Sequence, residues 1–125
     1  MKKNIVWIVL IVLVALGGVY LLKNETPKDT NQPVGNELTV TYTDSGYHPK
    51  QITIKAGTAV KFVNQSQNPM WTASDPHPTH TMMHDFDAMR SMMKGESYSF
   101  TFERAGTWRY HNHMVPGHMG SVIVE

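Results

Sequence analysis

The chain has 125 residues and a formal net charge of +1, a length that suits one domain with a short additional segment. Four of the eleven basic residues (Lys2, Lys3, Lys23 and Lys28) precede residue 29, and no basic patch accompanies the aromatic residues, which argues against nucleic acid as a partner. The absence of cysteine excludes disulfides, thiolate metal ligands and a lipid-modified N-terminal cysteine.

Residues 1–23 contain an uninterrupted apolar run over residues 5–22, with lysines on both sides. As a helix, this run would be about 27 Å long, which is at the short end of a membrane crossing. A cleaved secretory signal is the alternative, with Ala15-Leu16-Gly17 as a weak cleavage site. The leading lysines favour a cytoplasmic N-terminus, so both interpretations place the remainder outside the cytoplasm. We therefore expect a single-pass protein of the cell membrane, or a secreted protein if the segment is cleaved.

Residues 24–36 are polar and show no apolar period, so we expect a flexible linker there. Residues 37–125 follow as one domain in which strand-like alternation recurs. Short alternating segments separated by glycine-containing turns favour an antiparallel β-sandwich. The alternating segments are 37–43, 51–55, 60–62, 97–103, 108–112 and 122–124.

The stretch 65–96 interrupts this pattern, because it runs for about 30 residues without a clear strand, and loops of that length are usually functional or disordered. It is rich in histidine and methionine, a composition that argues against a passive linker. Within it, residues 82–93 could hold a short helical turn. We therefore expect this stretch to carry function.

Two pairs of histidines are the main candidates for metal ligands. His77 and His80 are three residues apart in the long stretch, where two prolines limit the freedom of the backbone. His111 and His113 are two residues apart, so on a strand they share a face and lie about 6–7 Å apart. They can converge on one ion if the strand end curls, or bind two ions. His84 is a further candidate, and solvated surface histidines are the alternative for each of these residues.

Three segments carry a resemblance to a known family. Residues 46–64 (GYHPKQITIKAGTAVKFVN) place an aromatic residue and a proline before an isoleucine-rich strand, a glycine turn and a strand that ends in Val-Asn. Residues 98–111 and 120–124 supply a matching back half and closing strand. In this order and spacing they resemble the cupredoxin superfamily, specifically the small plastocyanin-like single-domain proteins. The resemblance implies an all-β, Greek-key antiparallel β-sandwich behind an N-terminal transmembrane helix.

The same resemblance marks the positions of the family's copper ligands, and this chain departs from them. The position of the blue-copper cysteine is Asn112, so a centre of two histidines and a cysteine is not expected. The first histidine position is Met70, the second lies near Val115, and the axial methionine position lies near His118. A family ligand normally lies in the final loop, which makes His118 or Met119 a candidate.

A second, local resemblance is to multicopper oxidases. Residues 106–113 (GTWRYHNH) resemble their Gly-Thr-x-x-Tyr-His-x-His segment, which supplies two copper ligands. Those enzymes assemble further histidine pairs across several cupredoxin domains, and this chain has one such domain. We therefore do not expect an enzyme, because multicopper-oxidase-like activity would need more domains or oligomerisation.

The topology that the resemblance implies also predicts which ligands meet. In a cupredoxin sandwich, the loop after the Val-Asn strand and the last loop lie at the same end. His111 and His113 should therefore meet His80, and His77 with it, where the long stretch folds over the sheet end. Asn112 should point inward and hydrogen-bond the loop backbone rather than bind metal. A softer site at the rim, favouring Cu(I), would consist of Met70, Met114, His118 and Met119.

The donor types favour copper as the metal. Thioethers select Cu(I), whereas imidazoles serve Cu(II), zinc, nickel or iron, so a mixed set without thiolate favours copper in both oxidation states. The methionines of the long stretch lie among polar residues, which is not the pattern of a core. Zinc could bind through the histidines alone.

Three functions follow from this composition. The first is copper scavenging, buffering or delivery at the outer membrane surface, with a copper-handling partner protein. The second is electron transfer or Cu(I) oxidation at a non-blue copper centre, with a redox partner. The third is a non-metal interaction module on the same scaffold. We expect the first.

Overall fold

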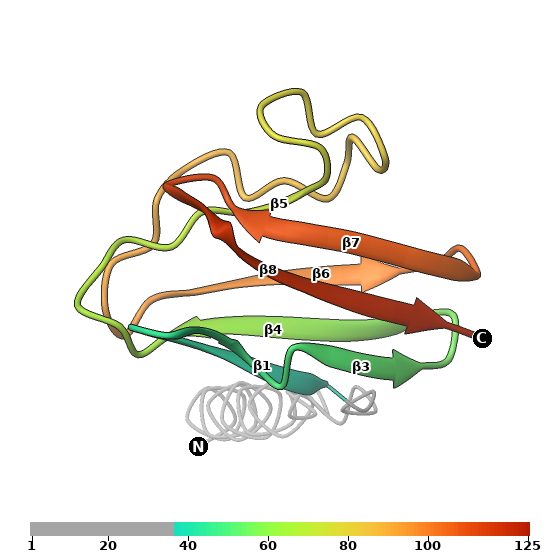
Figure 1. Ribbon diagram of the computed structural model, residues 1–125. Coiled ribbons are helices and arrows are strands. Elements are labelled where there is room, and N and C mark those ends of the chain that lie inside the picture. Colours follow the sequence, from blue (N-terminus) through green and yellow to red (C-terminus); the bar gives the residue numbers. More distant parts are fainter. Residues whose placement is uncertain (1–36) are drawn as a thin grey trace, which may run out of the picture. The chain divides into compact units, whose positions relative to one another are not determined.

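The computed structural model describes residues 37–125, none of which is helical (Figure 1). Residues 1–23, expected as an anchor or signal, and residues 24–36, expected as a linker, lie outside the described residues. Over the described range there is no helix long and apolar enough to cross a membrane. The strands of this part are β1 (Leu38–Thr43), β2 (Gly46–His48), β3 (Gln51–Ile54), β4 (Thr58–Asn64), β5 (Thr72–Ser74), β6 (Ser97–Phe102), β7 (Gly106–Asn112) and β8 (Val115–Val124).

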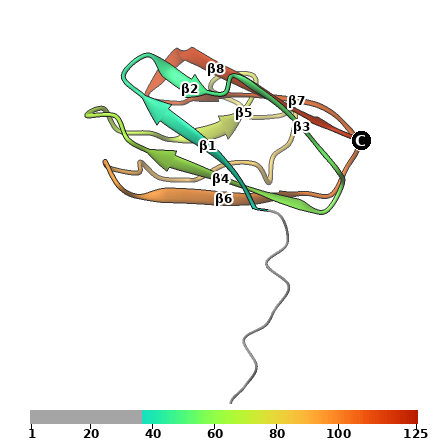
Figure 2. The same cartoon turned by 90° about the horizontal axis from the view of Figure 1, so that it is seen from below.

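The strands form two four-stranded sheets that face each other (Figure 2). The strand order is β2-β1-β4-β6 in one sheet and β3-β8-β7-β5 in the other. This confirms the expected all-β sandwich, but β1 pairs with β4, and β3 with β8, in parallel. The parallel pairs arise because β3 leaves the sheet of β1 and β2 before β4 returns to it in the direction of β1. The antiparallel pairing that we expected is therefore wrong for these two pairs.

The core lies between the sheets, where alternate residues of each strand point. In β4, Val60 and Phe62 are fully buried, whereas the intervening Lys61 is partly exposed. The ring of Phe62 meets Tyr110 of the opposite sheet edge-to-face, with centroids 5.2 Å apart and an interplanar angle of 72°. Burial of each large apolar side chain contributes about 1.5–3 kcal/mol, so contacts of this kind hold the two sheets together.

The segment between β5 and β6 is irregular, so the short helical turn expected at 82–93 is absent from the described structure. Met83, Phe86 and Met92 anchor the segment, because each is at most 4% exposed and belongs to the core. Met70 is also fully buried and exchanges two backbone hydrogen bonds with Met92, at 2.9 and 2.7 Å. The expectation that methionines of this stretch are not core residues is therefore wrong for Met70, Met83 and Met92. The side chains of these three methionines pack into the core beside β5, and their positions in the sequence follow no helical period.

Candidate metal centre

The end of β7 places two histidines on the outer face of its sheet. Side chains alternate along a strand, and Tyr110 lies in the core, so His111 points to the opposite face. His111 is nevertheless only 1% exposed, because the segment after β5 rises above β7 and covers it (Figure 1). His113 follows the end of β7, and its backbone N–H donates to the carbonyl of Trp71 at 2.7 Å. Both histidines are thus held beside the edge strand β5.

The segment after β5 adds two further histidines above this face. His77 is exposed, whereas His80 is only 7% exposed. The backbone N–H of His80 donates to the Pro76 carbonyl at 2.8 Å, and its carbonyl accepts from Ser74 Oγ at 2.9 Å. Its φ of +51° lies in the left-handed region, which costs a residue other than glycine on the order of 1 kcal/mol. The surrounding hydrogen bonds therefore hold His80 in an unfavourable backbone conformation.

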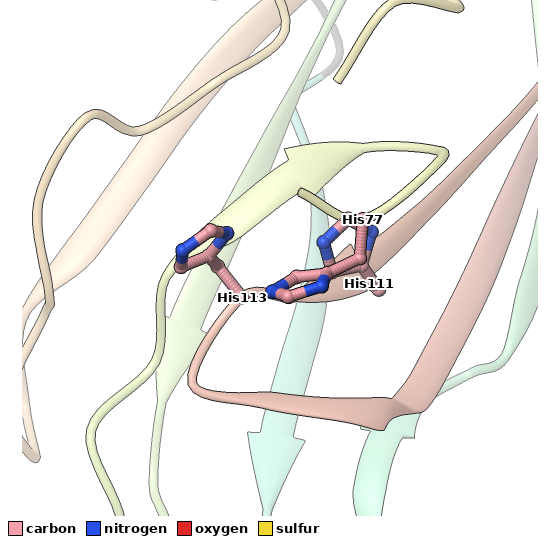
Figure 3. A group of neighbouring side chains, drawn as sticks. All are labelled: His77, His111 and His113. Atoms are coloured by element: carbon pink, nitrogen blue, oxygen red, sulfur yellow. The ribbon is translucent and has the colours of Figure 1, made fainter. Parts of the chain in front are cut away.

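The four imidazoles of His77, His80, His111 and His113 form one group, which we call the four-histidine cluster. Ligand nitrogens of His77, His111 and His113 all lie within 4.8 Å of one another (Figure 3). His80 joins them through a contact of 3.0 Å between its Nε2 and Nδ1 of His113. The ring centroids of His80 and His111 are 5.2 Å apart. The predicted meeting of these four residues is therefore confirmed, although their role as metal ligands stays a prediction.

Two carboxylates fix the orientation of the buried rings. Asp75 Oδ1 lies 2.9 Å from Nδ1 of His111, and Asp87 Oδ2 lies 2.6 Å from Nδ1 of His80. An ionised carboxylate only accepts hydrogen bonds, so each Nδ1 carries the proton and each Nε2 keeps its lone pair. Nε2 of His80 then accepts from Nδ1–H of His113, which leaves a lone pair on Nε2 of His113. Carboxylates that orient histidines in this way are typical of metal sites.

Asp87 is itself held by donors. Burial acts to raise its pKa, but hydrogen bonds from Trp71 Nε1, the Met89 backbone N–H and His80 outweigh this effect and leave the pKa below its usual value. The indole nitrogen of Trp71 lies 2.7 Å from Asp87 Oδ1, and its ring lies 4.5 Å from that of His113. Trp71 therefore contacts both His113 and the carboxylate that orients His80.

His111 has a buried atom without a partner. Its Nε2 is enclosed by protein and makes no hydrogen bond within residues 37–125, although Nδ1 of the same ring is paired with Asp75. Buried polar atoms are normally satisfied, so an unpaired one requires an explanation such as a bound ion. A metal ion among the imidazoles would supply that missing partner.

The protonation of the cluster also suits a cation. Burial, more than any other cause, lowers the pKa of His111, and Asp75 opposes the shift only in part. Burial likewise lowers the pKa of His113, and the nearby imidazoles of His77 and His80 lower it further. At neutral pH these two rings are therefore uncharged, which is the form that binds metal.

The spacing fits a metal ion after a small adjustment. Around a tetrahedral ion with metal–nitrogen bonds of about 2.0–2.1 Å, the ligand nitrogens would be about 3.4 Å apart. The observed limit of 4.8 Å is wider than this, and the exposed side chain of His77 can rotate toward the other two rings. The residues present therefore fit an imidazole-bound metal, whereas Asn112 supplies no thiolate for a blue copper centre.

Asn112 lies where the family resemblance expects the cysteine, and it is fully buried. Its Oδ1 accepts from the backbone N–H of Trp71 at 2.8 Å, and its Nδ2 donates to the Pro69 carbonyl at 3.0 Å. The prediction that Asn112 points inward and binds the loop backbone is therefore confirmed.

Of the softer site that we expected at the rim, the structure separates Met119 from Met70. Met70 lies in the core, whereas Met119 pairs with His111 across β7 and β8 and so shares the outer face. His118, its neighbour on β8, points the other way and pairs its Nδ1 with the Tyr42 hydroxyl at 2.8 Å. Met114 is 48% exposed. The expectation is therefore wrong for Met119, which lies on the outer face whereas Met70 lies in the core, and the roles of the other three residues stay predictions.

The remaining sequence candidate, His84, is exposed and lies outside the four-histidine cluster. Sequence reasoning missed Asp75 and Asp87, the two carboxylates that orient the rings. Asp75 could have been noticed, because it directly precedes the Pro-His-Pro-x-His segment and follows a short strand. Asp87 carries no such signal, because only the folding of the segment back onto Ala73 brings it near His80.

Comparison with known proteins places this geometry in a family context. The family model described as a cupredoxin-like domain matches residues 9–124. A purple cupredoxin from Nitrosopumilus maritimus superposes with a TM-score of 0.62 at 19% identity, covering 71% of this chain and all of that protein, a likeness of fold.

Amicyanin structures are also similar. An oxidised amicyanin mutant shares 26% identity with a TM-score of 0.62, over 70% of this chain and 81% of that chain. A mutant in its Cu(I) form shares 25% identity with a TM-score of 0.60, over 71% of this chain and 82% of that chain.

Proposed function

Because the chain belongs to the cupredoxin-like domain family, we propose that it binds copper, and that it does so at the four-histidine cluster. Amicyanin, a structural relative, is known in a Cu(I) form, which makes copper the natural metal to test first. The proposed site lies on the outer face of the β3-β8-β7-β5 sheet, not at the inward position of Asn112. The family fold would thus serve a copper site of different composition.

Nε2 of His111 is the observation that carries this proposal. It is buried, lacks a hydrogen-bond partner within the described part of the chain, and belongs to a ring whose Nδ1 is fixed by Asp75. Burying an unpaired polar atom costs about 1–3 kcal/mol, and a bound cation removes that cost. His77 and His113 complete a set of three nitrogens from two separate segments.

Copper fits this donor set better than zinc. Nitrogen sites bind Cu(II) more tightly than Zn(II) along the usual order of divalent metals, and nothing in the cluster restricts the geometry to that of zinc. His77 is exposed on a loop, so this ligand can dissociate while buried His111 and half-buried His113 remain. This arrangement supports reversible holding of copper for scavenging, buffering or delivery, and a binding protein rather than an enzyme.

We place this function on the outer side of the cell membrane. Residues 5–22 would act as the anchor, with the partner being a copper-handling protein that exchanges metal at the His77 side. Support for the location comes from the apolar run and its flanking lysines alone.

Metal analysis of the purified full-length chain tests the binding. The parent protein should hold copper in a stable ratio, and a variant with His111→Ala and His113→Ala should lose tight Cu(II) binding while its circular dichroism is retained. A matched control carries His48→Ala and His84→Ala, two exposed histidines outside the cluster. A parent without copper, or a double variant at 111 and 113 that retains it, would contradict the proposal.

The colour of the loaded protein gives a second readout. The intense visible band of blue copper needs a thiolate, and this chain has no cysteine. The Cu(II) protein should be pale, with an electron paramagnetic resonance spectrum typical of nitrogen and oxygen ligands. An intense blue colour is the outcome that would refute this ligand assignment.

A further inference from the structure

The four-histidine cluster is backed by two anionic side chains. Asp75 is 4% exposed, and the side chain of Asp87 is 10% exposed, so both carboxylates lie in a region of reduced solvent screening. The nearest cation is Arg109, whose Nε lies 3.5 Å from Asp75 Oδ2 on a side chain that is 61% exposed. Asp87 receives uncharged donors from Trp71 and the Met89 backbone. The surroundings of the imidazoles therefore carry more negative than positive charge.

Each carboxylate acts on the metal position through a ring. Asp75 is joined to His111 directly, and Asp87 is joined to His113 through His80, with contacts of 2.6 and 3.0 Å along that chain. Such carboxylate–histidine pairs make the free nitrogen a stronger donor and favour higher positive charge on a bound ion.

We propose that Asp75 and Asp87 set the oxidation state that the site binds, so that its ligand is Cu(II) rather than Cu(I). The inference rests on the copper-binding function proposed above. Two buried carboxylates stabilise a doubly charged ion more than a singly charged one. The donors point the same way, because the cluster is built of imidazoles, which serve Cu(II), whereas Cu(I) prefers thioethers.

Methionine positions agree with this assignment. Met70 is fully buried in the core, and Met114 lies in the turn between β7 and β8 with 48% of its surface exposed. Met119 shares the outer face with His111 as its cross-strand partner, but it is 48% exposed. Met119 is therefore the thioether that the sheet register places on the same face as His111, and it is the one to test for a competing Cu(I) site.

Asparagine variants test the charge of each aspartate. In Asp75→Asn, the amide oxygen can still accept from Nδ1–H of His111, but the negative charge is gone. In Asp87→Asn the charge is also gone, but the single amide oxygen can accept either from His80 or from Trp71 and the Met89 N–H, so this variant loses a hydrogen bond as well. The matched control is Asp85→Asn, which makes the same charge change at an exposed residue of the same segment. All are made in the full-length chain, and Met119→Leu is added to test the thioether.

Affinities for Cu(II) and Cu(I) are measured separately by competition with chelators specific for each ion, and the midpoint potential is measured independently. Each Asn variant should lose about 10–100-fold in Cu(II) affinity, the usual effect of removing such a partner, with a smaller loss for Cu(I). A tenfold loss of Cu(II) affinity relative to Cu(I) affinity raises the midpoint potential by about 59 mV. Asp85→Asn and Met119→Leu should leave the ratio unchanged.

The outcomes distinguish the two proposals. A parent chain that binds neither ion overturns the copper-binding function itself. If the parent binds copper but the ratio of the two affinities is unchanged in the Asn variants, only the assignment of Cu(II) is overturned. A sharply reduced Cu(I) affinity in Met119→Leu has the same consequence. Asp75→Asn, which keeps its hydrogen bond to His111, decides the question if it folds, as judged by circular dichroism of the metal-free protein. Asp87→Asn is the second variant, because Asp87 acts on a different ring.

Discussion

The two ring nitrogens of His111 have different surroundings, and the difference determines its chemistry. Nδ1 is paired with a buried carboxylate, whereas Nε2 is buried and has no hydrogen-bond partner in the described residues. Because burial lowers the pKa of His111 and of His113, both rings stay neutral to lower pH than an ordinary histidine. A metal then need not displace protons from these two residues at neutral pH.

Copper binding should therefore resist mild acid. We expect the Cu(II) affinity of the parent chain to change little between pH 8 and 7. It should decline only below about pH 6.5, the ordinary histidine pKa, as protons begin to compete for the ring nitrogens. Chelator competition at each pH measures this profile. A steep fall in affinity already between pH 8 and 7 would show that the site takes up protons there.

Asn112 is the second residue whose environment yields a prediction. Its side chain satisfies the Trp71 N–H and the Pro69 carbonyl, and it also accepts from the Met114 N–H at 3.1 Å. Replacement by leucine of similar size would leave these groups unpaired, so Asn112→Leu should lower the free energy of unfolding by about 2–4 kcal/mol. Denaturant titration measures the loss, and exposed Asn68→Leu is the control. An equal effect of the two substitutions would contradict this structural role for Asn112.

At the scale of elements, the alternation of apolar residues predicted β1, β3, β4, β6 and β7 because these strands bury one face. β5 could not be predicted from the sequence, because three residues are too few to show an alternation of apolar and polar side chains. The first half of β8 was not recognised from the sequence, because Pro116 and Gly117 resemble a loop. Gly120, which the family resemblance already placed in the closing strand, lies opposite Tyr110.

This close pairing of β7 and β8 predicts a strict requirement for glycine at position 120. A Cβ there would collide with the ring and hydroxyl of Tyr110, which is itself fully buried. Gly120→Ala should therefore destabilise the domain by about 1–3 kcal/mol. Gly117→Ala on the same strand meets no atom within 4 Å and serves as the control. Thermal unfolding compares the two, and a similar melting temperature for both variants would show that Tyr110 moves aside freely.

The candidate site was predictable to the extent that it depends on two local motifs. The histidine pairs at 77/80 and 111/113 stand out by their spacing, and topology alone places the segment after β5 near the end of β7. The aspartates could not be assigned in the same way, because their roles depend on long-range folding and on burial. The methionines of the long stretch were expected outside the core because they lie between strands. The sequence did not show that Phe86 and the nearby Met83 and Met92 pack into the core.

At the scale of the whole molecule, location is the property that most affects function. If residues 5–22 anchor the chain, residues 37–125 should be accessible from outside the cell. Protease added to intact cells should then remove the domain and leave a cytoplasmic control protein intact. Detection of the full-length protein only in the cytosolic fraction would contradict this topology.

The contact between Trp71 and His113 gives the protein an optical sensor of its own site. The chain has three tryptophans; Trp71 lies against the cluster, with ring centroids 4.5 Å apart, whereas Trp108 lies near the other end of β7 beneath Arg104. A paramagnetic ion held by His113 would quench the emission of Trp71 and leave that of Trp108 largely intact. The fluorescence of the unlabelled protein thus becomes a measure of how full the site is, at concentrations far below those that absorption of a pale copper centre requires.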